Sequence, residues 1–423
     1  MTLPSHADVV IVGAGAAGLT TAIAVRRHQP RLRVALLDGA ARPGAKILVS
    51  GGGRCNVANK IISERDFWGG RGAIVRRILR AFTVDDTIAF FRGLGITLRE
   101  EAGGKLFPES NRARDVLSAL LDGVSRAGAS LVAPARVLRI ARDGGQFAIE
   151  TSRGSIAARA VVLATGGLSL PKSGSDGAGY GFAREFGHTI VPTTPALAPL
   201  LLDAAAPRAI HTRVQGVSLD VEMRVWIDGR LATHIDGALL WTHFGVSGPA
   251  VLNASRHWAR AVLERTDVRI TVNLHPGDTF ESVDARWREA MVAHPRSTLR
   301  TRLSAAFPDS LASAVLEALD LDGDLVVAHL SRDDRRRLAR TLVDWPLAVT
   351  DTRGYNFAEV TAGGVDLAQV DPATMESRRC PDLFLVGEVL DVDGRIGGFN
   401  FQWAWATGHV AGRAVAARIR ARE

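Results

Sequence analysis

The stretch Asp8-Val-Val-Ile-Val12, followed directly by Gly13-Ala-Gly15-Ala-Ala-Gly18, decides the fold of this chain. The β-branched run is typical of a central parallel strand that is buried on both faces. In the pattern G-x-G-x-x-G, the first glycine makes a tight turn and the second lets a pyrophosphate approach the backbone. The third lets the following helix pack against the strand. The stretch therefore predicts a strand, a turn and a buried helix that together bind a dinucleotide.

A second predicted strand, Arg33–Leu37, ends in Asp38. An acidic residue there is placed to accept hydrogen bonds from the ribose hydroxyls of an adenosine. The helix that starts behind Gly15 offers free N–H groups and the positive end of its dipole to the phosphates. The alternative, a glycine turn that only packs a helix on a strand, leaves this acidic residue unexplained.

The chain after Asp38 favours FAD over NAD. Instead of a further strand–helix unit, it enters a predicted long loop, Arg42–Asn56, whose N–H groups, Lys46 and Arg54 could wrap a cofactor. Later, a β-meander is predicted, and its layout is typical of FAD enzymes with two dinucleotide-binding domains. The meander comprises Ser130–Ile140, Gln146–Thr151 and Ser155–Leu163, and it closes at Ala164-Thr-Gly-Gly167.

The last predicted site segment lies near the C-terminus. The strand Leu383–Val386 leads into Gly387-Glu388 and Asp391, and a helix-like run follows over Gln402–Ile419. A carboxylate at a strand end can bind ribityl hydroxyls. The helix N-terminus behind Gly397-Gly398 can stabilise negative charge on the pyrimidine edge of a flavin. One cofactor is then held by both ends of the chain, so the middle is an insertion.

Together these stretches resemble the BaiN/YhiN-type, aminoacetone-oxidase-like family of FAD flavoproteins. The motifs that carry the resemblance span nearly the whole chain in the family's order. They are the Gly13 loop, Gly44–Asn59 with its core S-G-G-G-R-C-N, Gly104–Pro108, Thr242–Pro249, Val360–Val365 and Gly387–Gln402.

The resemblance implies an α/β fold with a glutathione-reductase-like FAD-binding domain of the Rossmann type (ββα). This domain is discontinuous, with an inserted β-barrel and a helical subdomain. The implied FAD contacts are Gly13, Gly15, Ala16, Ala17, Gly18, Asp38, Gly39, Lys46, Ser50, Gly53, Arg54, Cys55, Asn56, Val137 through its backbone, Ala164, Thr165, Gly166, Gly387, Glu388, Asp391, Gly397, Gly398, Phe399 and Asn400. Asp38 stands where the family more often has Glu, and Phe399 where Tyr is frequent.

We predict an FAD-binding domain over residues 1–190 and 346–423. Prolines are frequent between Val191 and Pro207, which predicts that the chain leaves the FAD-binding domain there and enters the inserted β-barrel, residues 191–275. After Pro276 the composition turns helical, and residues 276–345 form the predicted helical subdomain.

Flavin supplies the redox chemistry in such proteins, so we expect an FAD-dependent oxidoreductase that moves a hydride between flavin and a small organic substrate, an amine or an enone. The sequence has no second strand–glycine–helix unit for a nicotinamide. NAD(P)H would therefore visit the flavin transiently, or dioxygen would accept the electrons, and both remain open.

Two residues are candidates for the reaction. His243 could transfer protons, because imidazole titrates near neutral pH, but a structural histidine fits the same pattern. Cys55 could be a redox partner of the flavin, but it lacks a second nearby cysteine, which favours packing or cofactor contact. The histidines are scattered without paired spacing, so no metal site is predicted.

Composition limits the classes of protein to which the chain could belong. It has 423 residues, 47% hydrophobic and 23% charged, which is typical of a globular protein. Two cysteines cannot build a disulfide framework, which favours a reducing, cytoplasmic location. The apolar stretch Val9–Val25 follows Asp8 and contains glycines, so we expect neither a signal peptide nor a membrane span.

The charge balance bears on a nucleic-acid partner. Lys and Arg total 52 against 44 Asp and Glu, a net charge of +8. Because arginine occurs throughout and is interspersed with acidic residues, we interpret the excess as background and do not expect such a partner. The alternative hypothesis, a flavin-containing nucleic-acid (tRNA)-associated protein, rests on Arg76-Arg77-Arg80 and Arg413–Arg422. The oligomeric state is not predicted.

Overall fold

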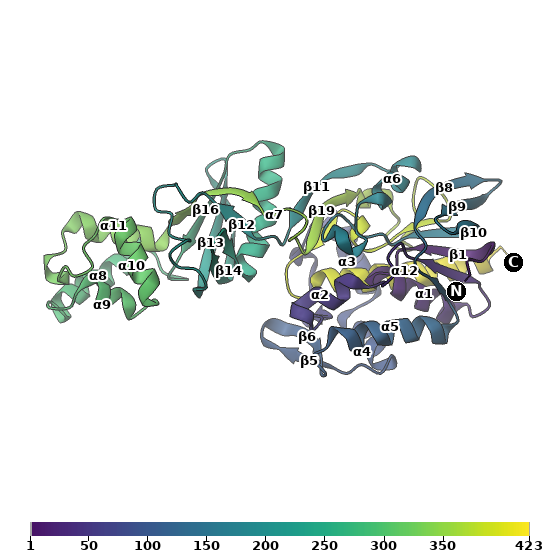
Figure 1. Ribbon diagram of the computed structural model, residues 1–423, viewed down its shortest axis with the longest axis horizontal. Coiled ribbons are helices and arrows are strands. Elements are labelled where there is room, and N and C mark those ends of the chain that lie inside the picture. The colour runs from purple at the N-terminus through teal and green to yellow at the C-terminus, as the bar shows by residue number, and fades with distance from the viewer. Residues whose placement is uncertain (1, 423) are drawn as a thin grey trace. The chain divides into compact units, whose positions relative to one another are not determined.

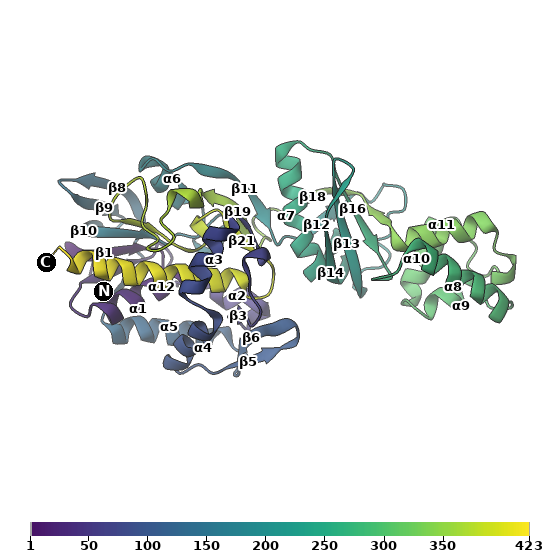
Figure 2. The same ribbon diagram turned by 180° about the vertical axis from the view of Figure 1, so that it is seen from behind.

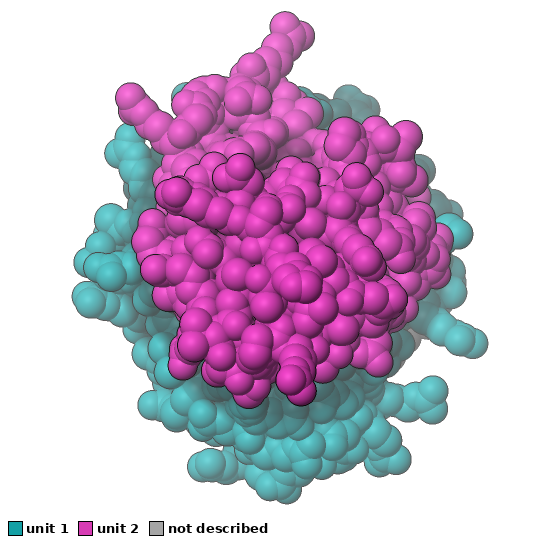
Figure 3. All heavy atoms as spheres, turned by 90° about the vertical axis from the view of Figure 1, so that its left-hand side faces the viewer, with its two compact units in different colours: residues 1–193, 359–423 teal, residues 194–358 magenta. Residues whose placement is uncertain are grey.

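The computed structural model describes residues 2–422 and divides into two compact units (Figures 1 and 3). Unit 1 comprises residues 1–193 and 359–423, and unit 2 comprises residues 194–358. Each unit has its own hydrophobic core. Residues 346–358, which we expected in the FAD-binding domain, lie in unit 2. They do so because β17 (Trp345–Leu347) and β18 (Val349–Thr352) pair with its sheet.

A seven-stranded sheet forms the centre of unit 1. Its order is β7-β2-β1-β10-β9-β8, and β20 also pairs with β10. The parallel strands are β7 (Ser130–Val132), β2 (Val34–Leu37), β1 (His6–Val12), β10 (Gly154–Leu163) and β20 (Leu383–Leu385), while β9 (Gln146–Thr151) and β8 (Val137–Asp143) run antiparallel. Val9–Val12 are buried, as expected for a central strand.

The helix α12 (Phe399–Arg420) packs against α1 (Ala16–His28), so the C-terminus completes the unit that the N-terminus begins (Figure 2). Two glycines of α12 allow this approach. A Cβ on Gly408 would lie 2.6 Å from the carbonyl oxygen of Ala17, and one on Gly412 would lie 2.5 Å from the Cβ of Ala24. Larger residues at these positions would push the two helices apart.

The remaining elements of unit 1 surround the sheet. They are α2 (Ala45–Gly53), β3 (Ala58–Asn59), β4 (Phe67–Gly69), α3 (Gly72–Ala81), α4 (Val84–Gly93), β5 (Leu98–Glu101), β6 (Lys105–Pro108), α5 (Ala113–Ala127), α6 (Ala178–Glu185), β19 (Val360–Val365), β21 (Val392–Gly394) and the short helix η6 (Gly387–Val389). The strand β11 (Ile190–Ala196) begins in unit 1 and continues into the first residues of unit 2.

Two predicted segments of unit 1 were wrong in detail. Arg42–Asn56 is not a loop throughout, because α2 begins with a helical turn over residues 45–49, packs against α5 and buries Ile47. From Ser50 to Gly52 the backbone is non-helical. The predicted strand Ser130–Ile140 is two strands, β7 and β8. Pro134 separates them, since it has no N–H to donate to a ladder.

Unit 2 contains a sheet followed by helices. Where we expected a β-barrel, the strands form a seven-stranded antiparallel sheet in the order β17-β16-β13-β14-β15-β12-β18. Its further elements are β12 (Leu200–Leu202), β13 (Ser218–Ile227), β14 (Arg230–Thr242), β15 (Gly245–Ser247), α7 (Pro249–Glu264), β16 (Val268–Asn273), α8 (Phe280–Ala293), α9 (Leu299–Ser304), α10 (Asp309–Ala318) and α11 (Arg332–Val343). None of the helices over residues 2–422 is both long and apolar enough to cross a membrane.

A half-buried histidine on α12, His409, gives unit 1 a sensitivity to acid. The ring of His409 stacks on Phe82 with 4.4 Å between centroids and meets His28 edge-on at 5.9 Å. Burial, together with the nearby positive charges of His28 and Arg413, lowers the pKa of His409 to about 4. The ring is therefore neutral in the folded protein at neutral pH.

We expect acidification to destabilise the protein through His409. An unfolded histidine titrates near ~6.5, so in the window between that value and the folded pKa of about 4 the unfolded chain binds more protons. The stabilisation is complete above the unfolded pKa and is lost as the pH falls toward the folded one. In His409→Phe, the fall in urea midpoint from about pH 7 to about pH 5 should be smaller than in the wild type. An equal fall in both proteins would contradict this role.

Candidate functional site

The three glycines that follow β1, of which Gly18 already lies in α1, have different surroundings. Gly13 has a φ of 105°, and a Cβ there would lie 2.4 Å from the carbonyl oxygen of Ala164. A Cβ on Gly18 would lie 1.9 Å from the carbonyl oxygen of Gly13. At Gly15, by contrast, no atom lies within 4 Å of an added Cβ. Gly13 and Gly18 therefore allow backbone packing, while Gly15 faces open space at the N-terminus of α1.

Asp38 is fixed beside this turn at the end of β2. Its Oδ2 accepts a hydrogen bond from the N–H of Ala14 at 2.7 Å, and its Oδ1 accepts one from Ala40 at 2.8 Å. Its carbonyl oxygen accepts from the N–H of Ala135 at 2.6 Å, just before β8 begins at Val137. The structure thus brings the turn, Asp38 and the start of β8 together.

Gly387 brings the C-terminal segment to the same place. Its φ is 73°, and a Cβ on it would lie 2.8 Å from the Cβ of Ala17 in the first turn of α1. Its N–H donates to the hydroxyl of Thr407 on α12 at 3.0 Å. Glu388, the next residue, is therefore held close to the glycine turn.

The carboxylate of Glu388 joins several segments. Lys46 of α2 donates from Nζ to its Oε2 at 2.7 Å, forming an ion pair. The hydroxyl of Ser169 donates to Oε1 at 2.8 Å, and the N–H of Thr361 donates to Oε1 at 3.0 Å. Lys46 also donates to the oxygen of Ser169 at 2.7 Å. Protein donors therefore hold the carboxylate that we expected to face ribityl hydroxyls.

Sequence reasoning missed Ser169 and Thr361. The hydroxyl of Thr361 accepts from the N–H groups of Leu168 and Ser169 at 2.8 and 3.0 Å. A Cβ on Gly167 would lie 2.5 Å from that hydroxyl oxygen. Only their positions in the sequence could have pointed to them: Ser169 follows the predicted A-T-G-G turn, and Thr361 lies in the motif V-T-A-G-G.

The motif S-G-G-G-R-C-N ends α2 and continues beyond it. Its three glycines, Gly51–Gly53, have φ values of 56°, 68° and 83°, and they are exposed. Arg54 pairs with Glu101 at 3.1 Å and lies 4.0 Å above the ring of Phe107. The glycines leave backbone accessible, whereas Arg54 is engaged with the protein.

Cys55 is a buried thiol. Its exposed fraction is 0%, and burial raises its pKa to about 12. The thiolate that would act in a redox exchange is therefore not populated at neutral pH. This environment favours the packing or cofactor-contact interpretation of Cys55.

Several buried polar atoms lack a hydrogen-bond partner among residues 2–422. They include Asn56 Oδ1, Thr165 Oγ1 and Ser175 Oγ. Buried polar groups are satisfied in most native structures, so each of these needs an explanation. Asn56 and Thr165 belong to the predicted cofactor contacts, and Ser175 packs on Gly166, where a Cβ would lie 2.4 Å from its hydroxyl oxygen. These residues fit a cofactor rich in hydrogen-bonding groups.

The segment before α12 also approaches other backbone closely. Gly397 and Gly398 have φ values of 118° and 96°, and a Cβ on Gly398 would lie 2.4 Å from the carbonyl group of Ala58. No side chain caps the start of α12, so the N–H groups of its first turn can face a ligand.

Two predicted contact residues near this helix start are engaged with the protein. Asn400 accepts from the N–H of Gly394 at 2.7 Å and donates to its carbonyl oxygen at 2.9 Å. Phe399 is buried and meets Phe67 edge-on, with 6.1 Å between centroids. The carbonyl oxygen of Asp391 accepts from the N–H of Gly70 at 2.7 Å.

His243 lies in unit 2, at the turn between β14 and β15. It is exposed, and its ring meets Phe244 edge-on with 5.0 Å between centroids. Its role in proton transfer stays a prediction. Among residues 2–422, no group of three or more His, Cys, Asp or Glu side chains is placed to hold a metal ion.

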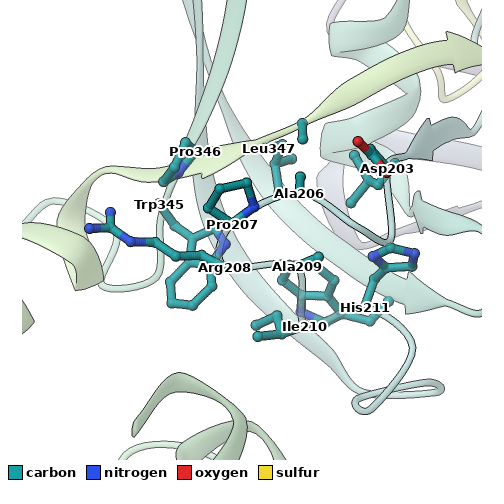
Figure 4. Close-up of a pocket in the computed structure, with 13 residues that line it drawn as sticks. Asp203, Ala206, Pro207, Arg208, Ala209, Ile210, His211, Trp345, Pro346 and Leu347 are labelled. Atoms are coloured by element: carbon teal, nitrogen blue, oxygen red, sulfur yellow. The ribbon is translucent and has the colours of Figure 1, made fainter. Parts of the chain in front are cut away.

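Unit 2 also has a small hollow between the segments 202–211 and 345–348 (Figure 4). The buried Nδ1 of His211 and Nε1 of Trp241 belong to side chains that line it, and neither atom has a hydrogen-bond partner in the described chain. Its volume of about 10 Å³ has room for about one water molecule. The hollow is too small for a flavin or an organic substrate.

The strand–glycine turn–helix, the acidic residue after β2 and the returning C-terminal segment define an FAD-dependent oxidoreductase with a Rossmann-type domain. A family model described as the HI0933-like protein Rossmann domain matches residues 7–414, and the chain belongs to this family.

Similar proteins agree with this assignment. The 3-dehydro-bile acid delta(4,6)-reductase of Clostridium scindens is 33% identical over 408 residues, covering 96% of this chain and 98% of that protein. The ribosomal RNA dihydrouridine synthase of Escherichia coli is 34% identical over 401 residues, covering 95% and 96%. The FrdA subunit of Escherichia coli quinol fumarate reductase aligns with a TM-score of 0.52 and 16% identity, over 100% of this chain and 72% of that chain. The last likeness shows the fold alone. The family resemblance and the α/β fold class with a Rossmann-type domain, both predicted from the sequence, are confirmed.

Gly15→Val should abolish FAD retention without unfolding the protein. The backbone at Gly15, with φ −82° and ψ −169°, is extended, which valine adopts readily, and no protein atom lies within 4 Å of an added Cβ. The side chain would instead fill the expected approach of the pyrophosphate. The purified variant should lack flavin absorbance and take up no added FAD. Gly93→Ala, at an equally open site on α4, should keep its flavin. Full retention by Gly15→Val would refute the placement.

Lys46→Met should weaken FAD binding about tenfold, equivalent to about 1.4 kcal/mol, as measured by titration of the apoprotein. The substitution leaves the carboxylate of Glu388 without a counter-charge close to the glycine turn, where it would repel phosphate. In Lys46→Met/Glu388→Gln most of the affinity should return, because the amide oxygen still accepts from Ser169 and Thr361 without carrying charge. A double variant that binds no better than Lys46→Met would contradict this electrostatic explanation.

Proposed function

We propose that the protein is a reductase that saturates a carbon–carbon double bond conjugated to a carbonyl group, with FAD as its cofactor and NAD(P)H as a transient donor. The proposal is carried by one observation: the names of both relatives imply reduction of a double bond that is conjugated to a carbonyl group. A 3-dehydro bile acid with delta(4,6) unsaturation has double bonds conjugated to a ketone. Dihydrouridine is uridine in which the ring double bond, conjugated to a ring carbonyl, has been saturated.

The type of bond that the two named substrates share is a better guide to this chain's reaction than either substrate molecule. A steroid and a pyrimidine in RNA differ in size, charge and shape, so neither substrate transfers directly to this chain. We therefore propose the bond type, carried by a small organic substrate, and take a uracil base within RNA as a second candidate. Oxidation of an amine with dioxygen, which the sequence left open, is named for neither relative.

The residues of this chain would bind and orient the cofactor. FAD, when bound, supplies the hydride-transfer chemistry. The first N–H groups of α1, exposed by Gly15, would bind the pyrophosphate, and Asp38 would accept from the adenosine ribose. In its ion pair with Glu388, Lys46 would offset the negative charge of that carboxylate, so that the carboxylate does not repel the phosphates. The uncapped start of α12 would stabilise negative charge at the flavin.

Anaerobic spectroscopy tests the proposal. We expect NADH or NADPH to bleach the flavin absorbance and a carbonyl-conjugated alkene, such as a ketosteroid enone, to restore it with formation of the saturated product. Two matched controls, the saturated ketone and an alkene without a carbonyl, should leave the absorbance bleached. Bleaching by amines instead, with recovery only on admission of dioxygen, would overturn the proposal in favour of an oxidase.

A further inference from the structure

The excess positive charge of the chain is confined to unit 1. This unit holds 33 of the 52 Lys and Arg residues and 24 of the 44 Asp and Glu residues, a net charge of +9. Unit 2 holds 19 basic and 20 acidic residues, a net charge of −1. The arginines are therefore not a uniform background, although they are spread evenly along the sequence.

Five exposed basic residues lie on four helices of unit 1, of which α1 and α3 pack against α12 and α5 packs against α1. We call them the cationic face. They are Arg27 and His28 in the last turn of α1, Arg80 in the last turn of α3, Arg126 in the last turn of α5, and Arg413 on α12.

Ring contacts bring these helix ends together. Arg27 lies 5.3 Å above the ring of Phe90. Phe82, which directly follows α3, stacks on His409 of α12, and His409 in turn meets His28. The end of α3 that carries Arg80 is therefore fixed beside α12. Phe82 and Phe90 are 4% and 7% exposed, so they cannot stack on a nucleotide base.

The positive charges on this face lie close enough to repel one another. Burial and the positive charge of Arg126 lower the pKa of Arg27, and burial and Arg413 lower the pKa of His28. Within residues 2–422, none of Arg27, Arg80, Arg126 and Arg413 forms an ion pair. A cluster of cations that form no ion pairs attracts polyanions, and it does so more strongly at low salt.

The face suits a phosphate polymer better than a membrane. A helix that lies on a lipid surface inserts exposed apolar side chains next to its basic ones. The exposed large hydrophobic residues of the described chain are Leu48, Val49, Ile61, Leu138, Leu231, Val262, Leu263, Val292 and Phe357. None of them lies on α1, α3, α5 or α12, so the face offers charge without an apolar anchor.

We propose that the cationic face of unit 1 binds the phosphodiester backbone of a nucleic acid, through its phosphates and without recognising base sequence. The arginines supply the charge, and the buried ring of Phe90 lies beneath one of them, Arg27. The surface does not depend on the proposed reductase activity, because phosphates bind to it whether or not the flavin turns over.

The test is binding of a fluorescent RNA hairpin to the flavin-loaded protein over a range of salt concentrations. The logarithm of the affinity should fall linearly with the logarithm of salt, with a slope of about −3 for about four neutralised phosphates. Arg80→Glu/Arg413→Glu should weaken binding at least about tenfold and flatten the slope by about 2. A duplex DNA of equal length should respond to the substitutions in the same direction, since it presents the same phosphates.

Arg296→Glu/Arg332→Glu is the matched control. It makes the same change in net charge at two exposed arginines of unit 2 and should bind RNA like the wild type. Equal weakening by both double variants, no weakening by Arg80→Glu/Arg413→Glu, or no binding at low salt would overturn the proposal. Binding to phosphatidylserine vesicles but not to RNA would overturn it as well. Flavin content, thermal midpoint and enone reduction are measured in parallel, so that loss of RNA binding is distinguished from unfolding and from failure of the reductase proposal.

Discussion

The rest of unit 1 depends on the ion pair and the hydrogen bonds that the carboxylate of Glu388 makes. This carboxylate accepts from Lys46, Ser169 and Thr361, which come from α2, from the turn after β10 and from β19. A carboxylate has enough acceptor positions for all three donors, and the charge of Lys46 offsets the cost of removing it from water. Because Gly387 beside it touches α1, the same point fixes where the C-terminal segment returns to the N-terminal sheet.

Local sterics explain which parts of the fold could be predicted from the sequence. Gly18 is needed because a side chain there would meet the carbonyl oxygen of Gly13 at 1.9 Å, a constraint that acts within a few residues of chain. Gly13 obeys the same steric rule against the distant Ala164, at 2.4 Å, and its place in the G-x-G-x-x-G pattern made it predictable. The roles of Ser169 and Thr361 could not be predicted in the same way, because their partner Glu388 is far away in the sequence. The helical turn that begins α2 was missed for a related reason: it packs against α5, a segment distant in sequence.

The arginines show the same limit of sequence reasoning. Interspersion of charges along a chain does not imply interspersion in space, since a fold can sort residues by unit and by face. Unit 1 carries the whole excess, and helices that are distant in sequence bring the charge of Arg126 close to Arg27 and that of Arg413 close to His28. Composition established the size of the excess, but only tertiary structure located it.

The division of unit 1 into residues 1–193 and 359–423 has a consequence for synthesis on the ribosome. The central strand β1 and helix α1 emerge early, but α12 and β20, which pack against α1 and β10, emerge last. All of unit 2 is translated in between, which takes on the order of ten seconds or more. During that interval the nascent N-terminal half exposes apolar surface that has no partner yet. Unit 2 can fold first, and chaperones that shield the waiting half would raise the yield of active protein.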